Sequence, residues 1–190
     1  MSSLECDDPG PKIFEWLESA AGGSPGYYLI PLHLTWRDQG IEHDLEVFRA
    51  VSSQLAKEPD YWASCIRYAG WRHSLAACTC LLVSKNTQFF EDLCYRFQHG
   101  SWVTPQIAVT LGLLHAEQCR PFLTNVLKGS TEKLDFKTLA SANEVLQRLG
   151  TEVDLPPLPK EGFEQEDVSI AKMVVKRHWD FWSGRLCLRP

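Results

Sequence analysis

The helical pattern HSLAACTCLL at residues 73–82 returns as PQIAVTLGLL at residues 105–114 and as KTLASANEVL at residues 137–146, 32 residues apart each time. Four apolar columns agree across the three copies. Their members are Leu75, Ile107 and Leu139; Ala76, Ala108 and Ala140; Leu81, Leu113 and Val145; and Leu82, Leu114 and Leu146. A repeat of this length is one helix pair that cannot bury its apolar face alone, so the copies are predicted to stack as an α-solenoid.

The flanking segments extend this all-α prediction over one domain, residues 1–190. Residues 1–40 form an irregular N-terminal segment in which Pro31 interrupts an apolar stretch. Residues 41–70 are N-terminal helices and residues 71–150 are the repeated antiparallel helix pairs. Residues 151–165 are a proline-rich strap, and residues 166–190 are a capping helix and tail that cover the open end of the stack.

Composition predicts a soluble protein with one sizeable core. The chain has 190 residues, of which 44% are hydrophobic and 23% charged, as is usual for globular domains. Its apolar stretches, such as residues 75–83, are far shorter than the roughly 20 residues of a membrane-spanning helix. Residues 1–8 are acidic and lack the basic-then-apolar order of a secretory signal. We therefore expect a cytoplasmic protein with no membrane partner.

The seven cysteines are interpreted as core residues rather than as a metal site. Five of them lie in predicted helices among apolar neighbours, where a thiol behaves as a small hydrophobe in a reducing compartment. A metal site would recruit Cys78 and Cys80 with His73 or His115. Two residues of separation turn a helix by roughly 200°, which points the two thiols apart. We predict neither a metal nor a cofactor.

Charge disfavours nucleic acid as a partner. Residues 1–60 hold 11 acidic and 4 basic side chains, residues 61–150 hold 6 and 9, and residues 151–190 hold 7 and 6. The repeats are thus mildly basic, whereas a nucleic-acid reader normally has a concentrated basic stripe and a high pI. The sequence pI is about 5.7.

Two surfaces are candidates for binding a protein. The first is the edge where the first helix of each repeat begins, since stacking would gather aromatic and basic side chains there. Large aromatics are usually buried, so Trp71 and Trp102 are more simply interpreted as apolar staples that fix the chain at each helix start. Arg67, Arg72, His73 and His99 are harder to explain as core residues.

The second surface is the outward side of the second helices, which carries Arg96, Arg120 and Asn125 among mixed charges, although any one of these could simply be solvated. The predicted protein-binding residues are Arg67, Arg72, His73, Arg96, His99, Trp102, Arg120 and Asn125.

The sequence contains no phosphate loop, nucleotide glycine fingerprint, His-Glu-x-x-His helix or nucleophile elbow. We therefore predict that the protein is not an enzyme.

The pairs Leu75-Ala76, Ile107-Ala108 and Leu139-Ala140, each followed six residues later by a second apolar pair, resemble HEAT-like helical repeats. The resemblance covers residues 71–150 and departs from the usual form because the third copy lacks an adjacent second helix. The chain is similar to small bacterial HEAT-like proteins, some of which are immunity proteins for secreted toxins. This implies a non-catalytic immunity or adaptor protein that blocks a partner protein.

An alternative function is also open. An enzyme or small-ligand-binding protein could use a pocket between helical repeats, through His73, His99 or Cys94. A deep pocket with convergent polar groups would favour that alternative, and a broad open face would favour a protein partner. A continuous stripe of Arg67, Arg72, Arg96 and Arg120 would instead favour nucleic acid.

Overall fold

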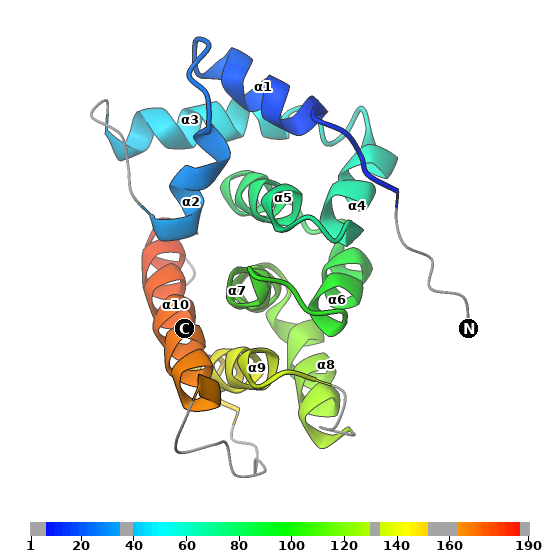
Figure 1. Cartoon of the computed structure of the whole chain (residues 1–190), viewed down its shortest axis with the longest axis vertical. Helices are drawn as coiled ribbons and strands as arrows, with labels where there is room; N and C mark the ends of the chain where they lie inside the picture. The colour runs from blue at the N-terminus through cyan, green and yellow to red at the C-terminus, as the bar shows by residue number, and fades with distance from the viewer. Residues whose placement is uncertain (1–6, 35–39, 130–133, 152–162, 187–190) are drawn as a thin grey trace. The chain divides into compact units, whose positions relative to one another are not determined.

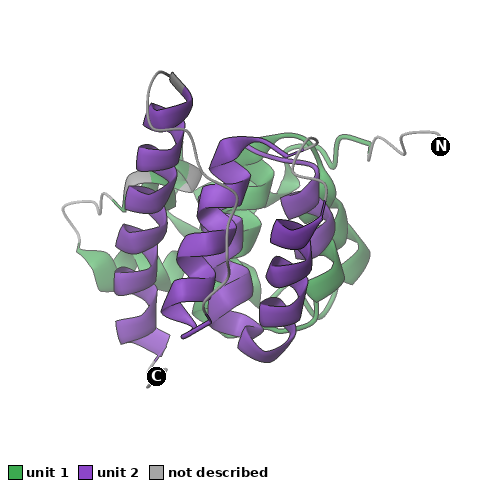
Figure 2. Cartoon of the chain, turned by 90° about the horizontal axis from the view of Figure 1, so that it is seen from below, with its two compact units in different colours: residues 1–92 green, residues 93–190 purple. Residues whose placement is uncertain are grey.

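The computed structural model describes residues 7–34, 40–129, 134–151 and 163–186, and all regular secondary structure in these ranges is helical (Figure 1). The all-α prediction is therefore confirmed. The chain divides into two compact units, residues 1–92 and residues 93–190 (Figure 2). The boundary falls within α6 (Phe90–Gln98). Organisation as one domain stays a prediction.

Unit 1 is built around a central helix, α5. Its elements are α1 (Lys12–Ala20), the 3-10 helix η1 (Tyr27–Leu29), α2 (Ile30–His33), α3 (Ile41–Ser52), α4 (Pro59–Arg67) and α5 (Trp71–Ser84). The pattern at residues 73–82 forms most of α5, and all ten of those residues are buried. Helices α2, α3 and α4 and η1 all contact α5, and α1 packs on α3. A helix that is apolar all round is thus covered on several sides, as its pattern requires.

Unit 2 has a matching central helix, α7. The unit contains the end of α6, then α7 (Thr104–Leu114), α8 (Ala116–Lys128), α9 (Phe136–Arg148) and α10 (Phe163–Leu186). Ten consecutive residues of α7, 104–113, are buried. Helices α8, α9 and α10 contact α7, and α10 also packs along α9.

The repeat columns fall on α5, α7 and α9, and eleven of their twelve members are buried. Leu114 at the end of α7 is partly exposed. The last helix, α10, is buried at Val168, Ala171, Val175 and Trp182. It begins at residue 163, three residues before the predicted start at residue 166, and ends at residue 186. Most of the predicted proline-rich strap, residues 152–162, lies outside the described residues.

Helix starts follow local side-chain chemistry. Asp135 caps α9, because its carboxylate accepts a hydrogen bond from the Thr138 amide at 2.6 Å. Thr104 lies inside α7, and its hydroxyl oxygen accepts a hydrogen bond from the Ser101 amide. Pro59 is the first residue of α4, where a missing amide hydrogen is harmless.

Candidate functional site

The eight predicted binding residues are divided between the two units. Arg67, Arg72 and His73 belong to unit 1. The other five belong to unit 2 and are Arg96, His99, Trp102, Arg120 and Asn125. The candidate sites are therefore built within each unit.

The two predicted binding arginines of unit 1, Arg67 and Arg72, are both exposed and both have neighbours. Arg67 at the end of α4 donates through Nε to Asp92, with 2.5 Å between the two atoms. Arg72 places its guanidinium carbon 4.6 Å from the centre of the Trp71 ring. Such partly solvated pairs contribute little to stability, and both side chains are exposed at the surface of unit 1.

His73 is buried, contrary to the expectation that it is not a core residue. The residue is 8% exposed, and its ring lies 4.5 Å from the Phe14 ring and 5.1 Å from the Tyr68 ring. Its Nε2 donates to the Gly10 carbonyl at 3.0 Å. Burial lowers the pKa of the imidazole. The neutral ring thus ties the segment before α1 to the start of α5.

Trp102 is the main surface feature of unit 2. It is 83% exposed, so its interpretation as a buried staple is wrong. The turn before α7 explains the difference, because it turns Val103 and Thr104 fully inward in place of the indole. Thr104 Oγ1 accepts from the Ser101 amide at 2.8 Å and donates to the Ser101 carbonyl at 2.8 Å. The indole therefore stands on a turn that hydrogen bonds hold in shape.

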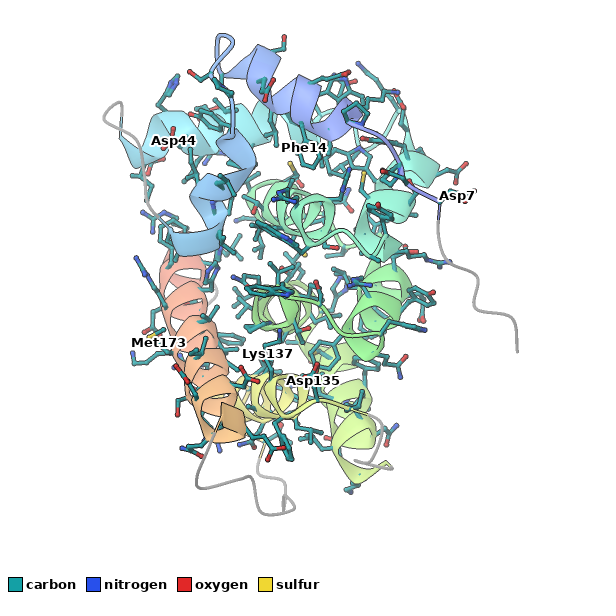
Figure 3. The ribbon with its side chains drawn as sticks, in the orientation of Figure 1. Asp7, Phe14, Asp44, Asp135, Lys137 and Met173 are labelled. Atoms are coloured by element: carbon teal, nitrogen blue, oxygen red, sulfur yellow. The ribbon has the colours of Figure 1, made fainter. Side chains whose placement is uncertain are left out.

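The start of α9 lies beside this turn. The Lys137 ammonium is 5.9 Å from the centre of the Trp102 ring. Asp135 Oδ2 lies 3.5 Å from where a Cβ on Gly100 would stand. Figure 3 shows both charged residues at the beginning of α9. Gly100 has a φ of 68°, a left-handed conformation that favours glycine, so the chain can turn close to that carboxylate.

His99 and Tyr95 extend the same turn toward α6. Their rings stack with 4.0 Å between centroids at an interplanar angle of 26°. His99 is exposed, and its Nδ1 donates to the Tyr95 carbonyl at 2.7 Å. We define the Trp102 surface as the following residues: Tyr95, His99, Trp102, Asp135 and Lys137.

The second predicted surface is not one uniform outward face. Arg96 is 7% exposed, because it lies on α6 beside the fully buried Leu93 and Phe97, and burial lowers the pKa of its guanidinium. Asn125 is exposed on α8. Arg120 on the same helix is partly buried and lines a cavity. These three residues thus have three different environments.

This cavity of about 580 Å³ lies among α7, α8, α9 and α10 of unit 2. Its lining residues are Gly112, Leu113, Ala116, Arg120, Arg148, Leu149, Gly150, Trp179, Asp180 and Ser183. Arg120 Nη2 donates to the Leu149 carbonyl at 3.2 Å. The volume lies within the range of roughly 300–1,000 Å³ that is usual for small-molecule sites.

A charged network borders this cavity on one side. Arg148 donates to Glu144 at 3.2 Å and to Asp180 at 2.9 Å, and Lys176 donates to Asp180 at 2.6 Å. The hydrogen bond from Lys176, together with the charge of Arg148, lowers the pKa of Asp180. Asp180 is therefore an ionised carboxylate that two cations already neutralise.

Sequence reasoning missed the α10 contribution to the cavity, namely Trp179, Asp180 and Ser183. The sequence around these residues does not indicate a site. The one local pattern, Lys176 four residues before Asp180, is common on any solvated helix. The contact of α10 with α7, far apart in sequence, brings them to the cavity.

The residues named for the alternative function are divided between the units, with His73 in unit 1 and Cys94 and His99 in unit 2. Cys94 is buried, and neither Cys94 nor His99 lines the cavity of unit 2. The five cysteines within the described residues are buried, and burial raises the pKa of Cys119 to about 12. Among the described residues, no three His, Cys, Asp or Glu side chains are placed to hold a metal ion. No helix in the same ranges is long and apolar enough to cross a membrane.

Comparison of the chain with protein-family models, with curated proteins and with solved structures gives no match.

Proposed function

We propose that this chain is a non-catalytic protein-binding module with HEAT-like repeats, which acts as a bacterial immunity or adaptor protein in the cytoplasm and blocks a partner protein such as a secreted toxin. The Trp102 surface is its main contact. The observation that carries the proposal is the 83% exposure of Trp102.

The Trp102 indole stands in water on a hydrogen-bonded turn, so the burial of its large apolar area does not stabilise the fold. Tryptophan is the residue most enriched among the few side chains that dominate protein interfaces. Hydrogen bonds within the turn at Ser101 and Thr104 keep the indole in place before binding, so little conformational entropy is lost when a partner covers it.

The polar neighbours of Trp102 suit an interface rim. Lys137 and Asp135 bring one positive and one negative charge to its side, and His99 adds a ring that can donate or accept. Rim charges of both signs select for a partner of complementary pattern and contribute more to specificity than to affinity. The surface thus combines one apolar anchor with adaptable polar contacts.

The proposed repeat architecture is supported by the burial of equivalent columns. Leu75, Ile107 and Leu139 are at most 3% exposed and occupy equivalent positions in α5, α7 and α9. Helices α6 and α8 follow α5 and α7 as second helices would. Such scaffolds generally present binding surfaces formed by successive repeats.

The test is an affinity capture from the source cells with the full chain and two variants. Trp102→Ala removes the proposed anchor, and Met173→Ala removes another exposed apolar side chain, 61% exposed, on a different helix of the same unit. We expect one stoichiometric partner to be retained by the wild type and by Met173→Ala. Trp102→Ala should weaken its binding about 30-fold or more, as for a central interface tryptophan that contributes roughly 2 kcal/mol or more.

Calorimetric titration with the purified partner gives the affinity, and thermal unfolding confirms that both variants are folded. Equal binding of the partner by the wild type and Trp102→Ala would refute the Trp102 surface as the contact. Failure of the wild type to retain any protein would refute the tight-inhibitor function.

A further inference from the structure

We propose that the cavity among α7, α8, α9 and α10 binds a small organic carboxylate, whose anionic group pairs with Arg120 and whose apolar body lies against Trp179. The inference concerns a different surface from the proposed protein contact. No residue of the Trp102 surface lines the cavity, and all of the lining residues lie in unit 2.

The apolar wall of the cavity is formed by a close approach between two helices. A Cβ on Gly112 of α7 would lie 2.7 Å from a ring carbon of Trp179 on α10. The missing side chain therefore allows the indole to lie directly against α7. Leu113, Ala116 and Leu149 complete an apolar lining next to that ring. Such a wall suits the hydrocarbon or aromatic body of a ligand.

Arg120 supplies the polar recognition. Its recorded hydrogen bond uses Nη2 alone, toward the Leu149 carbonyl at 3.2 Å. In the part of the chain that the structure describes, no carboxylate lies within ion-pair distance of Arg120. A guanidinium has five N–H donors in a planar fork that matches a carboxylate. The remaining N–H groups of Arg120 can therefore donate hydrogen bonds to an anionic oxygen from outside the protein.

Arg148, the second guanidinium at the cavity, is already paired. It donates to both Glu144 and Asp180. Asp180 also lines the cavity and pairs with Lys176 as well, so Glu144 and Asp180 balance the charges of Arg148 and Lys176, and Arg120 leaves one positive charge unbalanced. A ligand with a single negative charge suits this balance better than a phosphate dianion. The geometry points to a monocarboxylate.

The test uses isothermal titration of the full chain with three named acids: benzoate, indole-3-acetate and octanoate. Indole-3-acetamide and inorganic phosphate serve as the neutral and dianionic comparisons. We expect at least one acid to bind saturably at micromolar to millimolar concentration, with indole-3-acetamide and phosphate at least about tenfold weaker, since charge-assisted pairing is worth roughly 1.5–3 kcal/mol or about tenfold and more.

Three variants locate the binding. Arg120→Met keeps an unbranched side chain and removes the guanidinium charge, so acid binding should fall at least about tenfold, to the level of the amide. Ala116→Phe fills the cavity and should weaken the acid and the amide alike. Lys128→Met removes a positive charge from the same helix at an exposed position outside the cavity lining, and should change nothing.

The wild-type comparison of acid with amide keeps the test decisive if Arg120→Met does not fold. The proposal is overturned if none of the three acids binds, if the acid and its amide bind equally, or if Lys128→Met weakens acid binding as much as Arg120→Met does. Binding of the acids with no loss of the protein partner would separate this site from the Trp102 surface.

Discussion

Two glycines in helices of unit 2 have opposite surroundings. A Cβ on Gly112 would lie 2.7 Å from both Trp179 and Val145, whereas a Cβ on Gly184 in α10 would meet no atom within 4 Å. Both positions are helical, and neither has a positive φ. The intrinsic preference of a helix for alanine over glycine is therefore the same at both, and packing alone separates them.

We expect Gly112→Ala to lower the free energy of unfolding by about 1–2 kcal/mol, because overpacking outweighs the gain in helix propensity. Gly184→Ala should raise it by about 0.5–1 kcal/mol, because that gain meets no clash. Urea denaturation of the two variants and the wild type measures both values. Changes of the same sign in the two variants would contradict the close approach of Trp179 to α7.

At the scale of the element, α9 depends on its cap. Among the helices whose N-cap geometry the structure describes, Asp135 is the residue whose side chain accepts a hydrogen bond from the first turn. Helix α9 in turn packs against α7, α8 and α10. Loss of the cap hydrogen bond at Asp135 should therefore lower the stability of the whole of unit 2.

We expect Asp135→Ala to lower the free energy of unfolding by about 1 kcal/mol, since the Thr138 amide loses its acceptor. Asp135→Ser keeps an acceptor at the cap and should retain most of that stability. Denaturant unfolding followed by circular dichroism distinguishes the two. If serine and alanine are equally destabilising, the negative charge at the helix start matters, rather than the cap hydrogen bond.

At the scale of the whole molecule, each unit holds a buried neutral histidine. His73 in unit 1 is 8% exposed and His115 in unit 2 is 6% exposed, and burial lowers the pKa of both below the ordinary 6.5. A group with a lowered folded-state pKa binds its proton more strongly when the chain is unfolded. Its contribution to stability is thus complete above pH 6.5 and is lost as the pH falls below that value.

We expect the free energy of unfolding to fall as the pH is lowered from about 7.5 to about 5.5, a range above the ordinary pKa of carboxylates. The double variant His73→Gln and His115→Gln should show a flatter dependence than the wild type. Each single variant should show part of the effect. Denaturant unfolding at the two pH values measures it, and equal slopes in the wild type and double variant would rule out these histidines as the cause.

The local part of this architecture could be predicted from the sequence. The 32-residue columns lie on α5, α7 and α9, and α9 begins at Asp135, a residue type that is favoured at helix starts. Helical periodicity and capping involve residues within four positions of one another, so a short stretch of chain is sufficient to specify them.

The candidate site could be predicted in part. Trp102 and Arg120 were selected as binding residues, but the exposure of one and the cavity position of the other were not foreseen. His73 and Arg96 were expected at the surface and are buried. Whether a side chain is covered depends on elements distant in sequence, which local patterns do not describe.

By itself, the sequence determined the helical class, the apolar columns and the absence of known catalytic motifs, since these depend on composition and short-range spacing. The tertiary structure alone decided that Trp102 faces solvent and that α10 lies against α7 to form a cavity with Arg120. The physical reason is that burial and cavities arise where distant segments pack together, and that packing is a property of the folded chain rather than of any one segment.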